Sequence, residues 1–182
     1  VEFGNIVNYT YFENISEGTT DINSIKPAQA DNAINYFKVE LSKEFSFRNF
    51  KLDNRLLYQN VTNGEGVLNV PDVVLRSSFY YSNHLFKKAL FLQTGFTLNY
   101  FTKYNMNGYD PLLAEFYVQN ETELGGFPRL DFFINAKVRQ TRIYLKAEHF
   151  NASFTGFDYF SAPNYPFRDF IVRFGLVWNF FL

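Results

Sequence analysis

Apolar and polar residues alternate along most of the chain, and the pattern is clearest at its end. From Asp169 to Leu182, one face carries only apolar side chains: Phe170, Val172, Phe174, Leu176, Trp178, Phe180 and Leu182. The other face includes Arg173, Gly175 and Asn179. Because successive side chains of a β-strand point to opposite faces, the pattern predicts a strand with one apolar and one polar side.

The same alternation in earlier stretches predicts about eight strands in all, long enough to cross a membrane when tilted. Tight turns are predicted near 47–49, 83–86 and 140–141, and long polar loops at 14–31, 62–72, 103–129 and 151–168. The segment 114–119 resembles an extra strand, but we assign it to a loop because a spanning strand there would break the alternation of short and long connections. This rhythm is typical of barrels with short periplasmic turns and long extracellular loops, and it predicts that both termini are periplasmic.

Composition favours a membrane barrel over a soluble one of lipocalin type. Aromatic residues make up 21% of the 182 residues, yet the mean hydropathy is only −0.20. No stretch approaches the ~18 consecutive apolar residues of a transmembrane helix. Aromatic side chains also gather near predicted strand ends, where the interfacial girdles of a membrane barrel lie. We therefore predict an all-β fold: a transmembrane antiparallel up-and-down β-barrel, with residues 1–182 as one domain and the apolar face toward outer-membrane lipid.

The opposite, polar face carries more basic than acidic residues. We predict these as the lumen-lining side chains: Arg76, Lys137, Arg139, Arg142, Lys146, Glu148 and Arg173. One interpretation is a basic pore wall that favours anionic solutes. The other is a set of ion pairs that fill a narrow barrel, since a closed eight-stranded barrel has room only for side chains.

Other chemistry has little support in the sequence. The chain has no cysteine and a formal net charge of −1, which gives no reason to expect nucleic acid. His84 is predicted in a turn, and Glu148 and His149 are neighbours whose side chains should point to opposite faces of a strand. No phosphate loop, nucleophile elbow or metal-ligand spacing is present. We expect no catalytic residue, no metal and no cofactor.

Three segments near the end carry a family resemblance: Phe133–Thr141 (FINAKVRQT), Arg142–Asn151 (RIYLKAEHFN) and Ala162–Phe181 (APNYPFRDFIVRFGLVWNFF). They resemble the C-terminal portion of the putative β-barrel porin family of Bacteroidota-type outer membranes. The resemblance implies a barrel wider than this chain alone would form and a role in passive solute diffusion. It implies no catalytic residue and no assigned substrate.

Two functions remain open. The first is a porin-like channel for small solutes with a mildly basic lumen. The alternative is a non-conducting structural or interaction barrel that docks in a larger envelope complex. In either case the expected partners are outer-membrane lipid, the barrel-assembly machinery during insertion and possible other envelope proteins.

Overall fold

The computed structural model describes residues 1–15, 25–154 and 159–180, and in them all regular structure is antiparallel β apart from one isolated parallel bridge. Eight strands form the main sheet: β1 (Glu2–Ile6), β4 (Ile34–Phe47), β5 (Phe50–Thr62), β6 (Val73–Leu85), β7 (Leu90–Phe101), β12 (Arg129–Val138), β13 (Thr141–Glu148) and β16 (Ile171–Trp178). Each strand pairs with its neighbours in this order, so the sheet is an up-and-down meander. The all-β antiparallel prediction is confirmed.

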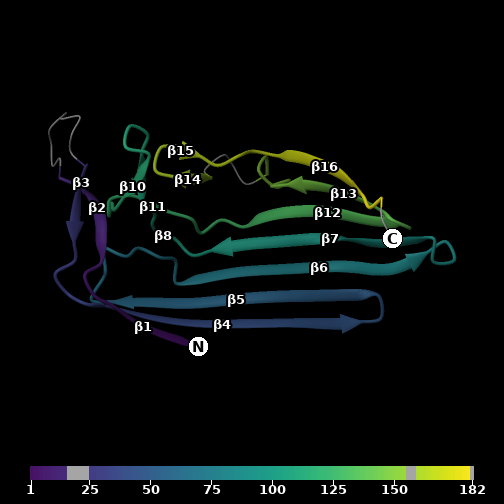
Figure 1. Ribbon diagram of the computed structural model, residues 1–182, viewed down its shortest axis with the longest axis horizontal. Coiled ribbons are helices and arrows are strands. Elements are labelled where there is room, and N and C mark those ends of the chain that lie inside the picture. Colours follow the sequence, from purple (N-terminus) through teal and green to yellow (C-terminus); the bar gives the residue numbers. More distant parts are fainter. Residues whose placement is uncertain (16–24, 155–158, 181–182) are drawn as a thin grey trace.

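The sheet is open. β1 and β16 are its two edges, and no pairing joins them in the part of the chain that the structure describes. Figure 1 shows the strands lying side by side, with the tight turns at one end and the long connections at the other. We call these the turn end and the loop end. The predicted alternation of short and long connections is confirmed.

The turns differ in detail from the prediction, because hairpin pairing extends further than the hydrophobic pattern suggests. Leu85 pairs with Leu90 and His84 with Phe91, so His84 lies in β6 and the prediction of a turn there was wrong. The turn itself begins at Phe86, whose backbone is left-handed at φ 51°. Similarly, Thr141 already belongs to β13.

Three of the long connections, those between β1 and β4, β7 and β12, and β13 and β16, form short strand pairs at the loop end. They contain β2 (Thr10–Asn14) with β3 (Ile25–Gln29), β8 (Tyr104–Asn105) with β11 (Glu123–Leu124), β9 (Gly108–Asp110) with β10 (Glu115–Tyr117), and β14 (Phe160–Ala162) with β15 (Tyr165–Pro166). The placement of 114–119 outside the main sheet is therefore confirmed.

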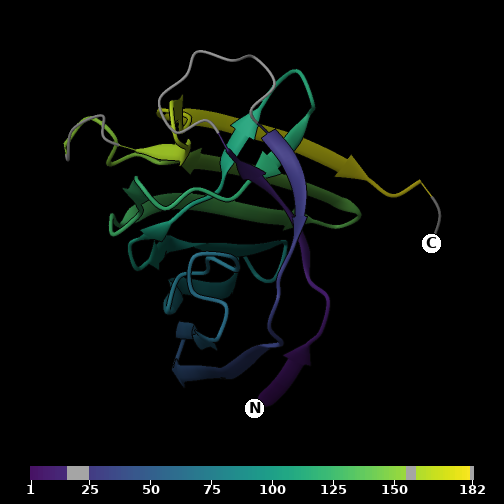
Figure 2. The ribbon, with the colours of Figure 1, turned by 90° about the vertical axis from the view of Figure 1, so that its left-hand side faces the viewer.

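The start of the chain corrects a prediction. The period-two pattern of Phe3, Val7, Tyr9 and Tyr11 predicts a single strand, but only Glu2–Ile6 joins the main sheet. Asn8 adopts a left-handed backbone (φ 57°) and turns the chain out of the sheet into the β2–β3 hairpin. Figure 2 faces the loop end and shows this hairpin reaching from the β1 edge to β10. There the amide of Val118 donates a hydrogen bond to the carbonyl of Phe12 over 2.8 Å.

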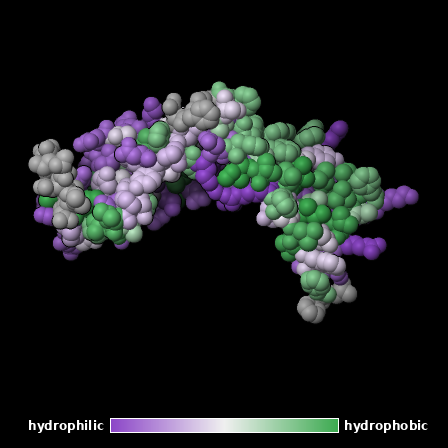
Figure 3. All heavy atoms as spheres, turned by 90° about the horizontal axis from the view of Figure 1, so that it is seen from above, coloured by the Kyte–Doolittle hydropathy of each residue, from purple (hydrophilic) through white to green (hydrophobic). Residues whose placement is uncertain are grey.

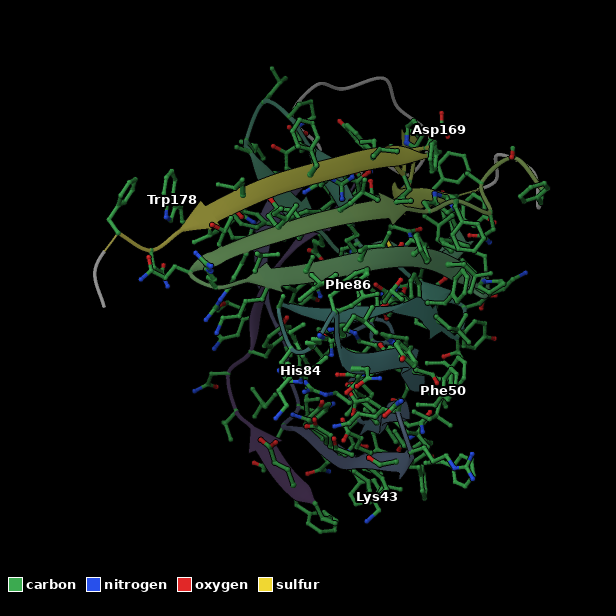
Figure 4. The ribbon with its side chains drawn as sticks, turned by 90° about the vertical axis from the view of Figure 1, so that its right-hand side faces the viewer. Lys43, Phe50, His84, Phe86, Asp169 and Trp178 are labelled. Carbon is green, nitrogen blue, oxygen red and sulfur yellow. The ribbon has the colours of Figure 1, made fainter. Side chains whose placement is uncertain are left out.

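The two faces of the sheet have opposite character. Figure 4 looks at the turn end and has Phe50 on one side of the sheet and His84 on the other. Apolar side chains gather over the turn-end half of the molecule in Figure 3, while hydrophilic ones gather over the loop end. Among the described residues, the buried apolar side chains are few and belong to the loop end or its neighbouring strands: Ile34, Val118, Ala152, Tyr159 and Ala162. The large apolar residues of the strands are instead exposed on the outer face.

Candidate pore wall and loop-end cavities

Register brings three arginines of the polar face into one row across the sheet. Arg55 of β5 lies opposite Arg76 of β6, Arg76 lies opposite Asn99 of β7, and Asn99 lies opposite Arg129 at the start of β12. We call these three arginines the arginine row. No ion pair joins any of them to a carboxylate within residues 1–15, 25–154 and 159–180. Their charges therefore act on the space in front of the sheet.

The next row toward the turn end is acidic and polar. Glu44 lies opposite Asp53, which lies opposite Ser78. Ser78 lies opposite Thr97, which lies opposite Asp131. Two residues along a strand span about 7 Å, so positive and negative rows lie one side-chain layer apart.

Ion pairs concentrate on the β12–β16 side of the polar face. Lys146 Nζ lies 3.1 Å from Asp131 Oδ2 and 3.0 Å from Glu148 Oε1. Glu148 Oε2 also lies 3.2 Å from Arg173 Nε and 3.5 Å from an Arg168 nitrogen. We call these five residues the ion-pair cluster. The three cations and two carboxylates there pair closely, so most of their charge is offset and a net charge of +1 remains.

Asp131 joins this cluster to the buried loop end. Its side chain is only 5% exposed, and Oδ1 accepts a hydrogen bond from the His149 amide over 2.9 Å. The His149 ring is buried and packs edge-on against Tyr159 at 4.3 Å. His149 Nδ1 lies 2.8 Å from the Arg168 carbonyl oxygen, which can only accept, so Nδ1 carries the proton. Burial also raises the pKa of the Tyr159 phenol, which stays neutral.

The expected separation of Glu148 and His149 was wrong. β13 ends at Glu148, and His149 takes a left-handed backbone (φ 55°), so strand alternation no longer applies. Both side chains line a small cavity of about 50 Å³. That volume suits one or two water molecules rather than a substrate.

A larger cavity of about 530 Å³ lies on the polar face between the arginine row and the ion-pair cluster. Arg76, Arg129, Asp53, Asp131 and Lys146 all line it. Its residues come from β5, β6, β7, β12 and β13, so only the folded sheet creates it. Tyr80 and Phe133 also line it, and their ring centroids are 6.4 Å apart across Gly95.

The predicted lumen residues fall into several groups. Arg76 and Lys146 line the 530 Å³ cavity, while Lys137 and Arg142 line a second cavity of about 480 Å³ nearer the turn end. Glu148 and Arg173 are ion-paired to each other. The alternation that assigned Arg139 to the wall ends at Val138, because Arg139 has φ 52° and occupies the β12–β13 turn.

Sequence reasoning underrated two members of the arginine row. Arg55 is not among the predicted lumen-lining residues, and Arg129 is the last residue of the predicted loop 103–129. Arg129 has the same parity as Asp131, Phe133 and Asn135, so extending the alternation backward by one pair would have found it. The row itself depends on strand register, which the sequence pattern does not give.

The opposite face presents exposed apolar side chains. Of the predicted lipid-facing residues, Val172, Phe174, Leu176 and Trp178 lie in β16 and are at least half exposed, and Phe170 and Phe180 just outside it are exposed as well. Leu182 lies outside the described residues. The same face continues through exposed Leu41, Phe45, Phe47, Phe50, Leu56, Phe79, Phe96 and Ile143. One polar spot interrupts it: Lys43 is exposed there, opposite Asn54, whose Oδ1 accepts a hydrogen bond from Ser77 at 2.7 Å.

At the loop end, a third cavity of about 590 Å³ is lined mostly by aromatic and aliphatic side chains. Six aromatic residues dominate it: Phe101, Tyr104, Phe116, Phe127, Phe160 and Phe167. We call this the aromatic cup. Gly125, at φ 106°, lets the chain turn beside it, and a Cβ there would lie 2.5 Å from the Phe101 ring. Burial raises the pKa of Tyr104, as expected for an apolar cavity wall.

Two searches for other kinds of site were negative within the described ranges. No helix in those ranges is long and apolar enough to cross a membrane. No group of three or more His, Cys, Asp or Glu side chains is arranged there to hold a metal ion.

Comparison with known proteins then decides the family. A family model described as "Putative porin" matches residues 1–182, the whole chain. The chain belongs to the putative porin family. The resemblance drawn from segments near the end of the chain is thereby confirmed at the level of the putative porin family, and the match extends to the whole chain. Neither the curated proteins nor the solved structures compared with the chain gave a match.

Membership of the putative porin family gives the two faces a context. In a porin, a polar wall faces water and an apolar wall faces lipid. This chain has the corresponding separation of side chains, with the arginine row, the ion-pair cluster and the 530 Å³ cavity all on one face.

Proposed function

We propose that the chain forms the wall of a porin-like channel in a bacterial outer membrane and allows passive diffusion of small solutes. In this proposal the apolar face contacts lipid and the polar face lines a water-filled lumen. The chain carries out no chemical reaction and needs no cofactor. The barrel-assembly machinery inserts it.

The observation that carries the proposal is the exposure of large apolar side chains on a single face. Phe45, Phe47, Phe79, Phe174 and Leu176 are each between 51% and 83% exposed. Moving such a side chain out of water gains about 1.5–3 kcal/mol, so a face with many of them is unfavourable in water and favourable in lipid. The charged side chains of the arginine row and ion-pair cluster lie on the opposite face, where lipid would not contact them.

Barrel closure follows from the two open edges. An unpaired backbone group costs several kcal/mol in hydrocarbon, so spanning sheets close on themselves. β1 and β16 each have one unpaired edge in the described structure. We propose that both edges pair with further strands in the membrane-inserted barrel, which makes the lumen wider than eight strands would enclose.

The proposed lumen is mildly basic. Arg55, Arg76 and Arg129 have no carboxylate partner among the described residues, and Lys137 and Arg142 also stand outside the ion pairs. We propose that these charges favour anions. We further propose that the loop end faces outward, with the turn end and both termini in the periplasm, and that Arg139 lies at the periplasmic rim.

Planar-bilayer recording on the full-length protein tests the channel. We expect discrete conductance steps and, in a salt gradient, a reversal potential on the anion-selective side. Conductance no greater than that of protein-free bilayers would overturn the channel proposal. Clear cation selectivity would overturn the proposal of a basic lumen but would be compatible with the proposal of a channel.

One observation favours the second candidate, a non-conducting structural or interaction barrel. The β2–β3 hairpin reaches across the loop end and pairs with the segment after β10 through the bridge between Glu13 and Val118. A hairpin in this position narrows an opening. If the bilayer recording gives no steps while the protein remains folded in the membrane, this candidate replaces the first.

A further inference from the structure

We propose that the aromatic cup and Arg129 together form a binding site for small organic anions that have an apolar body. The proposal deepens the proposed function, because it names a solute class for the loop-end side of the channel. The ligand places its apolar body in the cup and its carboxylate on the guanidinium of Arg129.

The first observation is the position of Arg129 between cavities. It lines the 590 Å³ cup, the 530 Å³ cavity of the polar face and the small cavity beside His149. The cup adjoins the arginine row on its loop-end side. Val74 lies two residues from Arg76 in β6, and Phe101, opposite Val74, lies two residues from Asn99 in β7. A ligand in the cup therefore reaches Arg129 first and can then pass toward Arg76.

The second observation is that the guanidinium of Arg129 stacks on an aromatic ring. Arg129 Cζ lies 5.0 Å from the centroid of the Phe167 ring. Stacking on an aromatic face holds the guanidinium in place while its in-plane N–H groups stay free to donate. A guanidinium binds a carboxylate with two parallel hydrogen bonds, so this arrangement suits a carboxylate better than a single-point anion.

The surrounding carboxylates do not neutralise Arg129. Asp131, Glu148 and Asp169 line the small cavity with it. Asp131 is paired with Lys146, and Glu148 with Lys146, Arg168 and Arg173. No ion pair links Asp169 to Arg129 in the described chain. The positive charge of Arg129 therefore remains available to a ligand.

The third observation concerns the cup. Its volume of about 590 Å³ lies within the ~300–1,000 Å³ typical of small-molecule sites, and such sites combine apolar walls with a few polar groups. Polar groups in the cup wall come from Asn69, Asn107 and Ser161, and Arg129 supplies the charge.

Equilibrium binding to the full-length protein in lipid nanodiscs tests the site without relying on conductance. The probe is 3-phenylpropionate, with acetate as an anion that lacks the apolar body and phenethylamine as a cation that retains it. We expect 3-phenylpropionate to bind at least about tenfold more tightly than either, as ligand-observed NMR titration would show. Equal affinity for acetate or for phenethylamine would overturn the proposal.

Substitutions of Arg129 test whether this residue forms part of the binding site. Arg129→Gln should weaken 3-phenylpropionate binding about tenfold or more, since a charge-assisted contact is lost. Arg129→Lys should give an intermediate loss, because it keeps the charge but not the paired donors. The matched control is Arg48→Gln: Arg48 also stacks on a phenylalanine, Phe47 at 5.5 Å, but in a turn at the opposite end. Its binding should equal that of the wild type.

A variant of the cup wall covers the case in which Arg129→Gln fails to fold. Phe116 is 57% exposed, so Phe116→Ala should leave the fold intact while weakening 3-phenylpropionate binding several-fold. Unchanged binding in both Phe116→Ala and Arg129→Lys would overturn the site. A protein that binds the probe but does not conduct overturns the channel alone, and one that conducts but does not bind overturns this site alone.

Discussion

Two regions of the polar face contain similar residues in opposite electrostatic situations. On β5, β6 and the start of β12, the arginine row has no carboxylate partner among the described residues. On β12, β13 and β16, Lys146 and Arg173 are bound to Asp131 and Glu148. The difference shows that the number of basic residues on the polar face does not by itself give the electrostatic field in front of it. The arginine row creates a field, whereas the ion-pair cluster holds strands and loops together.

The largest expected effect is on stability, and it contrasts two aspartates of the same row. Asp131→Ala removes a buried carboxylate that binds Lys146 and the His149 amide. Hydrogen bonds to charged groups are worth about 1.5–3 kcal/mol each, so we expect the free energy of unfolding to fall by about 2–4 kcal/mol. Urea titration of the protein in lipid vesicles, with tryptophan fluorescence as the signal, measures this free energy.

Asp53→Ala is the matched control for this prediction. Asp53 is part of the same row but has no ion pair among the residues that the structure describes. Its removal should change the free energy of unfolding by no more than about 0.5 kcal/mol. Similar losses for Asp131→Ala and Asp53→Ala would show that the ion-pair cluster does not stabilise the protein.

The second effect is on selectivity and contrasts two arginines. Arg76→Gln removes a charge that has no ion-pair partner among the described residues. A unit charge about 10 Å from an ion in water contributes about 0.4 kcal/mol, with opposite sign for anions and cations, so the chloride-to-potassium permeability ratio should fall about fourfold. Reversal potentials across a salt gradient measure the ratio.

Arg173→Gln serves as the comparison, because Arg173 Nε lies 3.2 Å from Glu148 Oε2 and that carboxylate offsets part of its field. The same measurement should give a change smaller than that of Arg76→Gln. If Arg173→Gln changes the permeability ratio as much, the distinction between an unpaired arginine row and an ion-paired cluster fails.

The smallest expected effect is that of salt on the wild-type channel. The Debye length falls from about 10 Å at 0.1 M to about 3 Å at 1 M, so the field of the arginine row is screened. Anion selectivity should therefore decline as both chambers are raised through this range at a fixed concentration ratio. Selectivity that does not depend on salt would point to direct contact sites rather than to a field.

Much of the fold could be predicted from alternation alone. The strands β4 to β16 of the main sheet, the assignment of each residue to a face and the rhythm of short and long connections all follow from a period of two. Three of the errors occur where the backbone becomes left-handed. At Asn8, Arg139 and His149 the period is broken, and neighbouring residues no longer take opposite faces.

The candidate sites could be predicted only in part. The sequence identified Arg76, Lys146, Glu148 and Arg173 as polar-face residues, but not which of them pair. It gave no indication of the aromatic cup, because Phe101 ends β7 whereas Phe127 and Phe167 lie in two different connections, and the three meet only at the loop end. Side chains so far apart in the chain carry no shared pattern.

The sequence by itself determined that this protein has an apolar and a polar face, because strand geometry sends alternate residues to opposite sides whatever their neighbours are. The sequence also determined the family, because the putative porin model matches residues 1–182. Only the tertiary structure decided which polar residues share a row, since rows depend on how hydrogen-bonded strands align. That alignment separates the arginine row from the ion-pair cluster and sets Arg129 against the aromatic cup.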